Sequence, residues 1–145
     1  MNPASTTRTP FVLTSKDPSF SALVEHLCQD SPLHLLTTAG PSITLETVRS
    51  NAPEFVLVDL DSVDAVEASR LLLKLALVSR AFVFLTGATA IPGTLALDAL
   101  FQAGAHGALV KPEGKTSLCL SGETGKTYLH QILALLDPLR KRRTV

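Results

Sequence analysis

Three side chains with useful chemistry stand at the ends of short apolar runs. Asp59 follows "EFVLV", Thr86 follows "AFVFL" and Lys111 follows "GALV". If these runs are parallel strands, their carboxyl ends meet at one edge of a sheet and bring the three side chains together. A carboxylate can act as a nucleophile there, and a hydroxyl and an ammonium can hold the oxygens of a phosphoryl group. The other interpretation is that Asp59 and Lys111 form a purely structural ion pair.

Further polar residues are expected near this edge. The first apolar run, "FVLTS", ends at Ser15, with Lys16 and Asp17 directly after it, and Asp61 stands two residues after Asp59. Because one or two carboxylates can suffice to bind Mg²⁺, Asp17 and Asp61 could join Asp59 in a weak metal site.

The elements that must position these residues alternate along the chain. Apolar runs predict strands at 11–15, 33–38, 54–60, 81–87 and 107–111, and helical patterns predict helices at 20–29, 43–50, 65–78, 94–103 and 127–140. This alternation is typical of an α/β protein with helices on both faces of a parallel sheet. Right-handed crossovers with short loops predict five strands in the order 2-1-3-4-5, a flavodoxin-like three-layer sandwich.

The composition fits one globular domain. The chain has 145 residues, of which 46% are hydrophobic and 18% charged. We expect a flexible N-terminal segment over residues 1–10, a domain over 11–140 and a basic C-terminal tail over 141–145, where a short basic run is usually a solvated helix end. The 113–125 loop contains "SGETGKT" but lacks a glycine that the phosphate-loop motif needs, because Leu120 stands there.

The charge balance bears on the partners. Lys plus Arg (13) equals Asp plus Glu (13), so no overall field attracts nucleic acid or a membrane. The sequence shows neither a signal peptide nor an apolar run long enough to span a bilayer. We therefore expect a cytoplasmic protein that binds neither nucleic acid nor membrane.

The same residues carry a resemblance to a known family. "PEFVLVDLD", "FVFLTGAT" and "AGAHGALVKP" resemble the third, fourth and fifth strands of the receiver domain of two-component response regulators. The segment from Thr86 to Leu118 is most similar to the receiver of the chemotaxis methylesterase, although the methylesterase domain itself is absent. The resemblance implies that Asp59 is the phosphoacceptor, that Thr86 and Lys111 contact the phosphoryl group, and that Pro112 follows a cis peptide bond.

The chain departs from the family at the metal site. Receivers carry two adjacent acids after the first strand, and Ser15 and Lys16 stand in their places. We expect the ammonium of Lys16 to lie near Asp59, where it would replace the cation and repel Mg²⁺. Ala108 also stands where receivers often have an aromatic switch residue.

These features together predict a degenerate receiver that is no enzyme and needs no cofactor. It would work as a protein-interaction module in bacterial two-component or chemotaxis-type signalling, with a histidine kinase or another signalling protein as partner. The alternative is a true receiver that is phosphorylated on Asp59, with Mg²⁺ held by Asp17 and Asp61.

Receivers commonly bind partners or dimerise through their last two helices and the strand between them. Apolar stripes on the expected helices 94–103 and 127–140 predict such an interface, with core packing as the competing explanation. Its expected residues are Leu97, Leu100, Phe101, Tyr128 and Leu135.

Overall fold

The structure is a computed structural model that describes residues 8–88, 90, 93–111 and 123–144. Strands and helices alternate along these residues, as the apolar runs predict. The strands are β1 (Thr9–Thr14), β2 (Leu33–Ala39), β3 (Phe55–Asp59), β4 (Phe82–Gly87) and β5 (Gly107–Val110). The helices are α1 (Pro18–Cys28), α2 (Pro41–Asn51), α3 (Ala65–Val78), α4 (Leu95–Ala103) and α5 (Glu123–Thr144).

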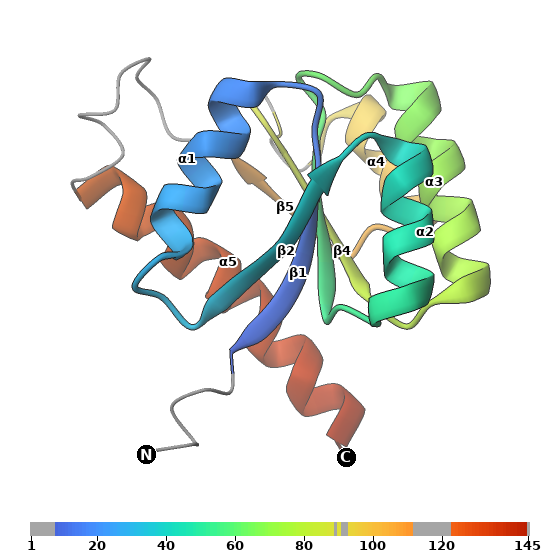
Figure 1. The fold of residues 1–145 in the computed structure, drawn as a ribbon. Coiled ribbons are helices and arrows are strands. Elements are labelled where there is room, and N and C mark those ends of the chain that lie inside the picture. The colour runs from blue at the N-terminus through green and yellow to red at the C-terminus, as the bar shows by residue number, and fades with distance from the viewer. Residues whose placement is uncertain (1–7, 89, 91–92, 112–122, 145) are drawn as a thin grey trace.

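The strands form one parallel sheet in the order β2-β1-β3-β4-β5, which confirms the predicted topology. Helices α1 and α5 cover one face of the sheet and α2, α3 and α4 cover the other (Figure 1). Because all strands point the same way, their carboxyl ends meet at one edge. Asp59 pairs with Thr86 in the register of β3 and β4, so both residues lie at that edge.

Successive strand residues point to opposite faces of the sheet and build two hydrophobic layers. Phe11, Phe55 and Phe84 pack toward α1 and α5, and the Phe11 and Phe55 rings stack with centroids 4.7 Å apart. Val56 and Leu85 pack in the second layer, beneath α2, α3 and α4. Strands β3 and β4 are buried along their whole length, and Asp59 and Thr86 lie at their polar ends.

Two ends of the chain differ from the expected boundaries. Strand β1 begins at Thr9, inside the segment expected to be flexible, and residues 1–7 lie outside the described part. Helix α5 continues to Thr144, so the basic run Lys141–Arg143 forms its last turn. Cations are favoured there because the last carbonyls of a helix carry partial negative charge. Most of the predicted 113–125 loop lies outside the described residues.

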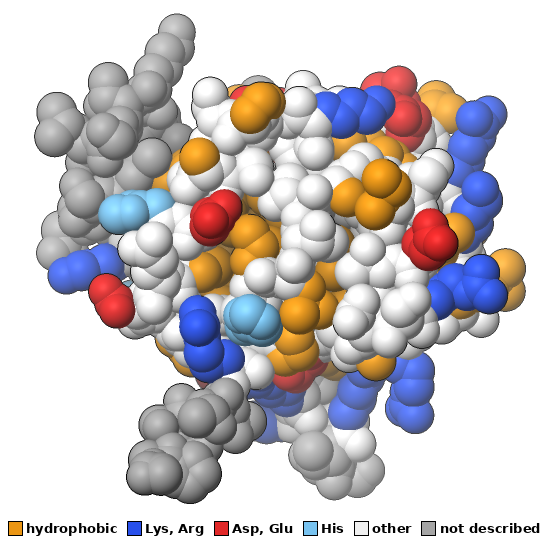
Figure 2. All heavy atoms as spheres, viewed as in Figure 1, with side chains coloured by type: hydrophobic (Ala, Val, Ile, Leu, Met, Phe, Trp, Pro, Cys, Tyr) orange, Lys and Arg blue, Asp and Glu red, His pale blue; other side chains and the backbone are white. Residues whose placement is uncertain are grey.

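Charged side chains are scattered over the face seen in Figure 2, and Lys and Arg residues gather along its right-hand edge. Within the described residues, no helix combines the length and the apolar character needed to cross a membrane.

Candidate functional site

The candidate site is the carboxyl edge of the sheet, and Asp59 lies at its centre. Asp59 ends β3 with its side chain fully buried. Its Oδ1 contacts the Lys111 Nζ at 2.7 Å and accepts a hydrogen bond of 3.0 Å from the backbone N–H of Asp61. Its Oδ2 accepts hydrogen bonds from Ser15 Oγ at 2.8 Å and from Ser62 Oγ at 2.9 Å. Each of the two carboxylate oxygens therefore contacts two donor groups of the same chain.

Lys111 supplies the positive charge of the site from the end of β5. Besides Asp59, its Nζ contacts Asp61 Oδ2 at 3.1 Å, and it lies 4.0 Å from the centroid of the Phe20 ring. Only 13% of the Lys111 side chain is exposed. The ammonium is thus enclosed by two carboxylates and an aromatic face, an arrangement in which Coulomb attraction is weakly screened.

The protonation state of Asp59 follows from these contacts. Burial by itself raises the pKa of Asp59, but the hydrogen bonds from Lys111, Ser15 and Ser62, together with the charge of Lys111, outweigh it. The net effect lowers the pKa of Asp59 below its ordinary value. Asp59 is therefore a carboxylate at neutral pH, paired with an internal ammonium.

The expected position of Lys16 is wrong. Its ammonium lies 2.9 and 3.1 Å from the two carboxylate oxygens of Glu67 on α3, and its side chain is half exposed. Lys16 directly follows the buried Ser15, and side chains of successive extended residues point to opposite sides. The cation beside Asp59 is therefore Lys111 rather than Lys16.

Asp17 also has a different role from the one proposed for a metal ligand. Its Oδ1 accepts a hydrogen bond of 2.9 Å from the backbone N–H of Ser19, and it is the N-cap of α1. An aspartate before a helix whose first residue is proline is a frequent N-cap, because its side chain bonds an otherwise unpaired backbone N–H.

The carboxylates that could bind magnesium at this edge are engaged in contacts within the chain. In the described part of the chain no three His, Cys, Asp or Glu side chains are grouped to hold a metal ion. Asp17 caps α1, and Lys111 contacts both Asp59 and Asp61. The ammonium thus lies against the carboxylates that the alternative assigns to the metal.

Thr86 is at the expected edge, but its hydroxyl has an unexpected partner. Thr86 Oγ1 and Tyr128 Oη share a buried hydrogen bond of 2.5 Å. The Tyr128 side chain comes from α5 and packs edge-on against Phe20, with ring centroids 6.4 Å apart. Burial raises the pKa of Tyr128 and the charges of Asp59 and Asp61 raise it further, against a lowering by the Thr86 hydrogen bond. Tyr128 therefore stays neutral and links α5 to β4.

Ser62 and Tyr128 are the site residues that the sequence did not assign to this edge. Ser62 follows Asp59 by three residues, in a turn where the Asp59 carbonyl accepts from the N–H groups of Ser62 and Val63. Tyr128 is the sole tyrosine of the sequence, and buried tyrosine hydroxyls usually find a partner. That rule could have indicated a polar contact on α5.

The predicted interface is wrong for three of its five residues. Leu97, Leu100 and Tyr128 are only 3%, 3% and 2% exposed, because they pack inside their own chain. Phe101 and Leu135 are half-buried and also pack against the core. Pro112 lies outside the described residues, so the cis bond before it stays a prediction.

Comparisons with known proteins add the following findings. No protein-family model and no curated protein matches this sequence. Among solved structures, the response regulator domain of Thermotoga maritima CheB matches with a TM-score of 0.71 at 13% identity, over 90% of this chain and 97% of that one. A CheY-like receiver domain protein from Methanospirillum hungatei matches with a TM-score of 0.69 at 13% identity, over 93% and 98% of the two chains.

A third solved structure agrees with these two. The signal receiver domain of the putative response regulator NarL from Mycobacterium tuberculosis matches with a TM-score of 0.59 at 20% identity, over 85% of this chain and 94% of that one. Identities this low carry information about the fold and not about individual side chains. The chain therefore has the fold of the receiver domains of two-component response regulators.

Proposed function

We propose that this chain is a degenerate receiver that works as a protein-interaction module in a cytoplasmic two-component or chemotaxis-type pathway. It binds partners and catalyses no reaction. The observation that carries the proposal is the state of Asp59, whose two oxygens accept four contacts from Lys111, Asp61, Ser15 and Ser62. The receiver fold of the chain supports a role in two-component signalling.

The geometry explains why phosphoryl transfer to Asp59 should be slow. An ionised carboxylate has about four lone-pair sites, and each is engaged here. An oxygen of Asp59 could attack phosphorus only after losing one of these contacts, inside a buried site. Such transfer also depends on a cation that neutralises the phosphoryl oxygens, and Ser15 is a poor metal ligand compared with a carboxylate. We therefore expect Asp59 to stay unphosphorylated and paired with Lys111.

A partner would bind where the surface leaves an apolar hollow. One such hollow, of about 380 Å³, lies along β5 and α5 and is lined by the small side chains of Ala90, Ala108 and Ala134, next to Val110 and Leu135. Val110 is 39% exposed at its rim. Apolar surface of this kind favours protein contact, and we propose it as the docking face for a histidine kinase or another signalling protein.

The phosphorylation state can be tested directly. The protein is incubated with acetyl phosphate or beryllofluoride and Mg²⁺, and intact mass and the amide shifts of Asp59, Thr86 and Lys111 are recorded. We expect no adduct and no shift change at this edge. A stoichiometric adduct that is lost in Asp59→Asn would contradict the proposal and would favour the alternative, a phosphorylatable receiver.

A gain-of-function variant makes the test sharper. Ser15→Asp places a second carboxylate beside Asp59, and Lys16→Asp also removes the positive charge of Lys16. We expect this double variant to bind Mg²⁺ in an NMR titration. The matched control is Ser15→Asn combined with Lys16→Asn, which has nearly the same shape without the two negative charges. Magnesium binding by the control would mean that the acids are not what the site lacks.

A further inference from the structure

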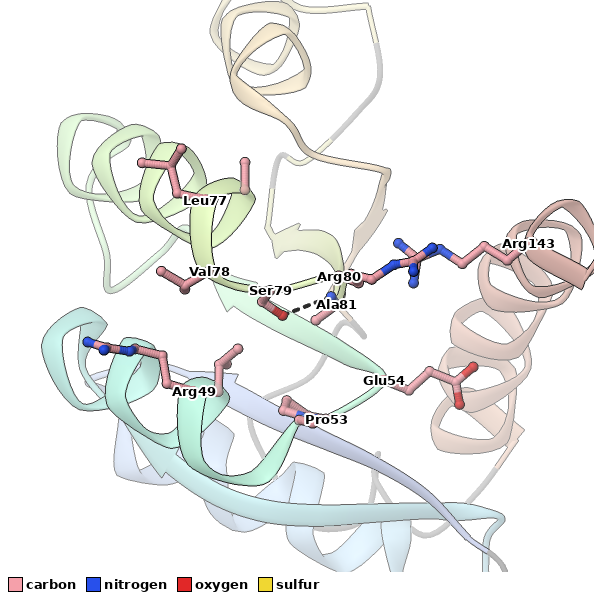
Figure 3. A pocket seen from close by; sticks show the side chains of 12 residues that line it. Arg49, Pro53, Glu54, Leu77, Val78, Ser79, Arg80, Ala81 and Arg143 are labelled. Atoms are coloured by element: carbon pink, nitrogen blue, oxygen red, sulfur yellow. Dashed lines mark hydrogen bonds between the residues drawn. The ribbon is translucent and has the colours of Figure 1, made fainter.

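A second pocket lies at the opposite edge of the sheet, where the strands begin and the helices end. It is formed by the last turns of α2 and α3, the loops 52–54 and 79–81, and Arg143 of α5 (Figure 3). Its volume is about 560 Å³. We call it the basal pocket. It shares no residue with the Asp59 site or with the hollow beside β5.

Two arginines of the basal pocket extend toward one another. Arg80 comes from the loop before β4 and Arg143 from the end of α5, and Figure 3 shows their guanidinium groups pointing into the same space. Among the described residues neither has a carboxylate within ion-pair distance. The nearby Glu54 is occupied by Arg140, whose Nε and Nη2 lie 2.5 and 2.9 Å from its two oxygens.

The helix ends explain only part of this charge. Cations are favoured near the last carbonyls of a helix, which accounts for Arg143 in the last turn of α5. Arg80, however, stands beyond Ser79, the C-cap of α3. Positive charges that line the same pocket repel each other, and among the described residues no carboxylate forms an ion pair with either arginine. An anion between them would remove the repulsion.

The wall beside the arginines is apolar. Leu77 is 86% exposed and Val78 is 44% exposed at the end of α3, and both line the pocket with Pro53. Large aliphatic side chains this exposed at the rim of a pocket can cover the carbon skeleton of a ligand. The basal pocket thus combines a cationic end with an apolar wall.

We propose that the basal pocket binds a small organic phosphomonoester, with its phosphate between Arg80 and Arg143 and its carbon skeleton against Leu77 and Val78. A phosphomonoester carries a charge of about −1.5 to −2 near neutral pH, which matches two guanidinium groups. Arginine forks bind phosphate oxygens in pairs. The pocket volume lies in the range of about 300–1,000 Å³ that is usual for small-molecule sites, whereas inorganic phosphate alone would leave the apolar wall uncovered.

The pKa of His106 offers a second measure of anion binding at Arg143, independent of the amide shifts of the pocket. Its Nδ1 accepts a hydrogen bond of 3.0 Å from the Val83 N–H, and its ring contacts Phe82, over which Arg143 Cζ lies at 3.8 Å. Burial lowers the pKa of His106, and the charge of Arg143 lowers it further. An anion bound at Arg143 therefore raises the pKa of His106.

The first experiment compares two probes, adenosine 5′-monophosphate and inorganic phosphate, by NMR titration of the full chain. We expect the nucleotide to shift the amides of Ala52, Glu54 and residues 79–81, to raise the pKa of His106 and to bind more tightly than inorganic phosphate. Leu77→Ser should weaken the binding of the nucleotide and leave the affinity for inorganic phosphate unchanged. Equal affinity for the two probes, or no shift at these amides, would overturn the proposal.

Matched variants separate the pocket from general charge. Arg80→Gln should weaken nucleotide binding about tenfold, the loss of one charge-assisted contact of roughly 1.4 kcal/mol. Arg70→Gln removes the same charge from α3 outside the pocket and should have no effect. Arg143→Gln, compared with Arg142→Gln on the same helix, tests the second arginine, with a melting curve to verify folding. Equal weakening by both members of a pair would overturn the proposal.

Discussion

The Asp59–Lys111 pair is the contact on which the residue-scale behaviour of the carboxyl edge depends. Lys111→Met keeps much of the side-chain volume but removes the ammonium from a fully buried carboxylate. Breaking such a pair by removing one partner is expected to lower the free energy of unfolding by about 3 kcal/mol. Urea denaturation of the wild type and the variant measures this difference.

The double variant Asp59→Asn with Lys111→Met is the control, and it should regain part of the loss. Because the folded-state pKa of Asp59 is lowered, its contribution is complete above the unfolded pKa of about 3.9 and is lost as the pH falls through the folded pKa. Wild-type stability should therefore decrease more steeply below about pH 4 than that of the double variant. The same acid dependence in both proteins would contradict this assignment.

The positions of the residues at the carboxyl edge were more predictable from the sequence than their contacts. Asp59, Thr86 and Lys111 each end an apolar run, and parallel strands necessarily bring such ends to one edge. Which cation pairs with Asp59 depends on the direction of a side chain in a loop, and this direction follows from tertiary packing. Lys16 was expected there from sequence position alone, but Glu67 on α3 binds it instead.

At the scale of elements, Tyr128 links α5 to the end of β4. Tyr128→Phe keeps the ring against Phe20 but leaves the Thr86 hydroxyl without its buried partner. We expect the free energy of unfolding to fall by about 1–2 kcal/mol, the usual range for a buried hydroxyl that loses its hydrogen bond. Chemical denaturation followed by circular dichroism measures the change.

Thr86→Val and the combination of Thr86→Val with Tyr128→Phe complete a double-mutant cycle. If the hydrogen bond carries the effect, the combined variant should be less destabilised than the sum of the single variants. Additive losses would mean that the two hydroxyls act independently, contrary to the contact described above.

Helix boundaries were predictable where a cap is local in sequence. The range 65–78 was predicted for α3 and is confirmed, with Asp64 accepting from the Glu67 N–H as N-cap. Helix α5 extends beyond its predicted range at both ends. Pro138 lies inside both the predicted and the observed helix, so the difference is confined to the two ends, where no local cap in the sequence marks the boundary.

At the scale of the whole molecule, the apolar stripes of α4 and α5 serve mainly the core. Leu100→Asp places a charge where the leucine is 3% exposed, so it should lower the free energy of unfolding by several kcal/mol. Val110→Lys changes an exposed position at the rim of the hollow beside β5 and should leave the melting temperature nearly unchanged.

Light scattering over a range of protein concentrations, together with melting curves, distinguishes the two variants. If the protein associates with itself through the hollow beside β5, the concentration-dependent increase in mass should disappear in Val110→Lys, because Val110 lies at the rim of that hollow. A Leu100→Asp protein that stays as stable as the wild type and changes only its mass would contradict the assignment of α4 to the core.

The fold itself was the most predictable feature of the molecule. Continuous apolar runs separated by helical patterns leave few arrangements other than a doubly covered parallel sheet. The same apolar pattern cannot separate a helix face that packs on the sheet from one that meets a partner, because both need leucines at the same spacing. Only the structure therefore shows that Leu97 and Leu100 belong to the core.

The strand order also has a consequence for how the chain is made. Ser15 and Asp59 can meet once the first half has left the ribosome, but Lys111, the charge that compensates Asp59, is synthesised 52 residues after it (111 minus 59). Tyr128 and Arg140 emerge later still, and Arg140 reaches back over 131 residues to Thr9. A nascent chain that ends before β5 thus holds an uncompensated carboxylate in its centre. We therefore expect the stable fold to form only after Lys111 and Tyr128 have emerged from the ribosome.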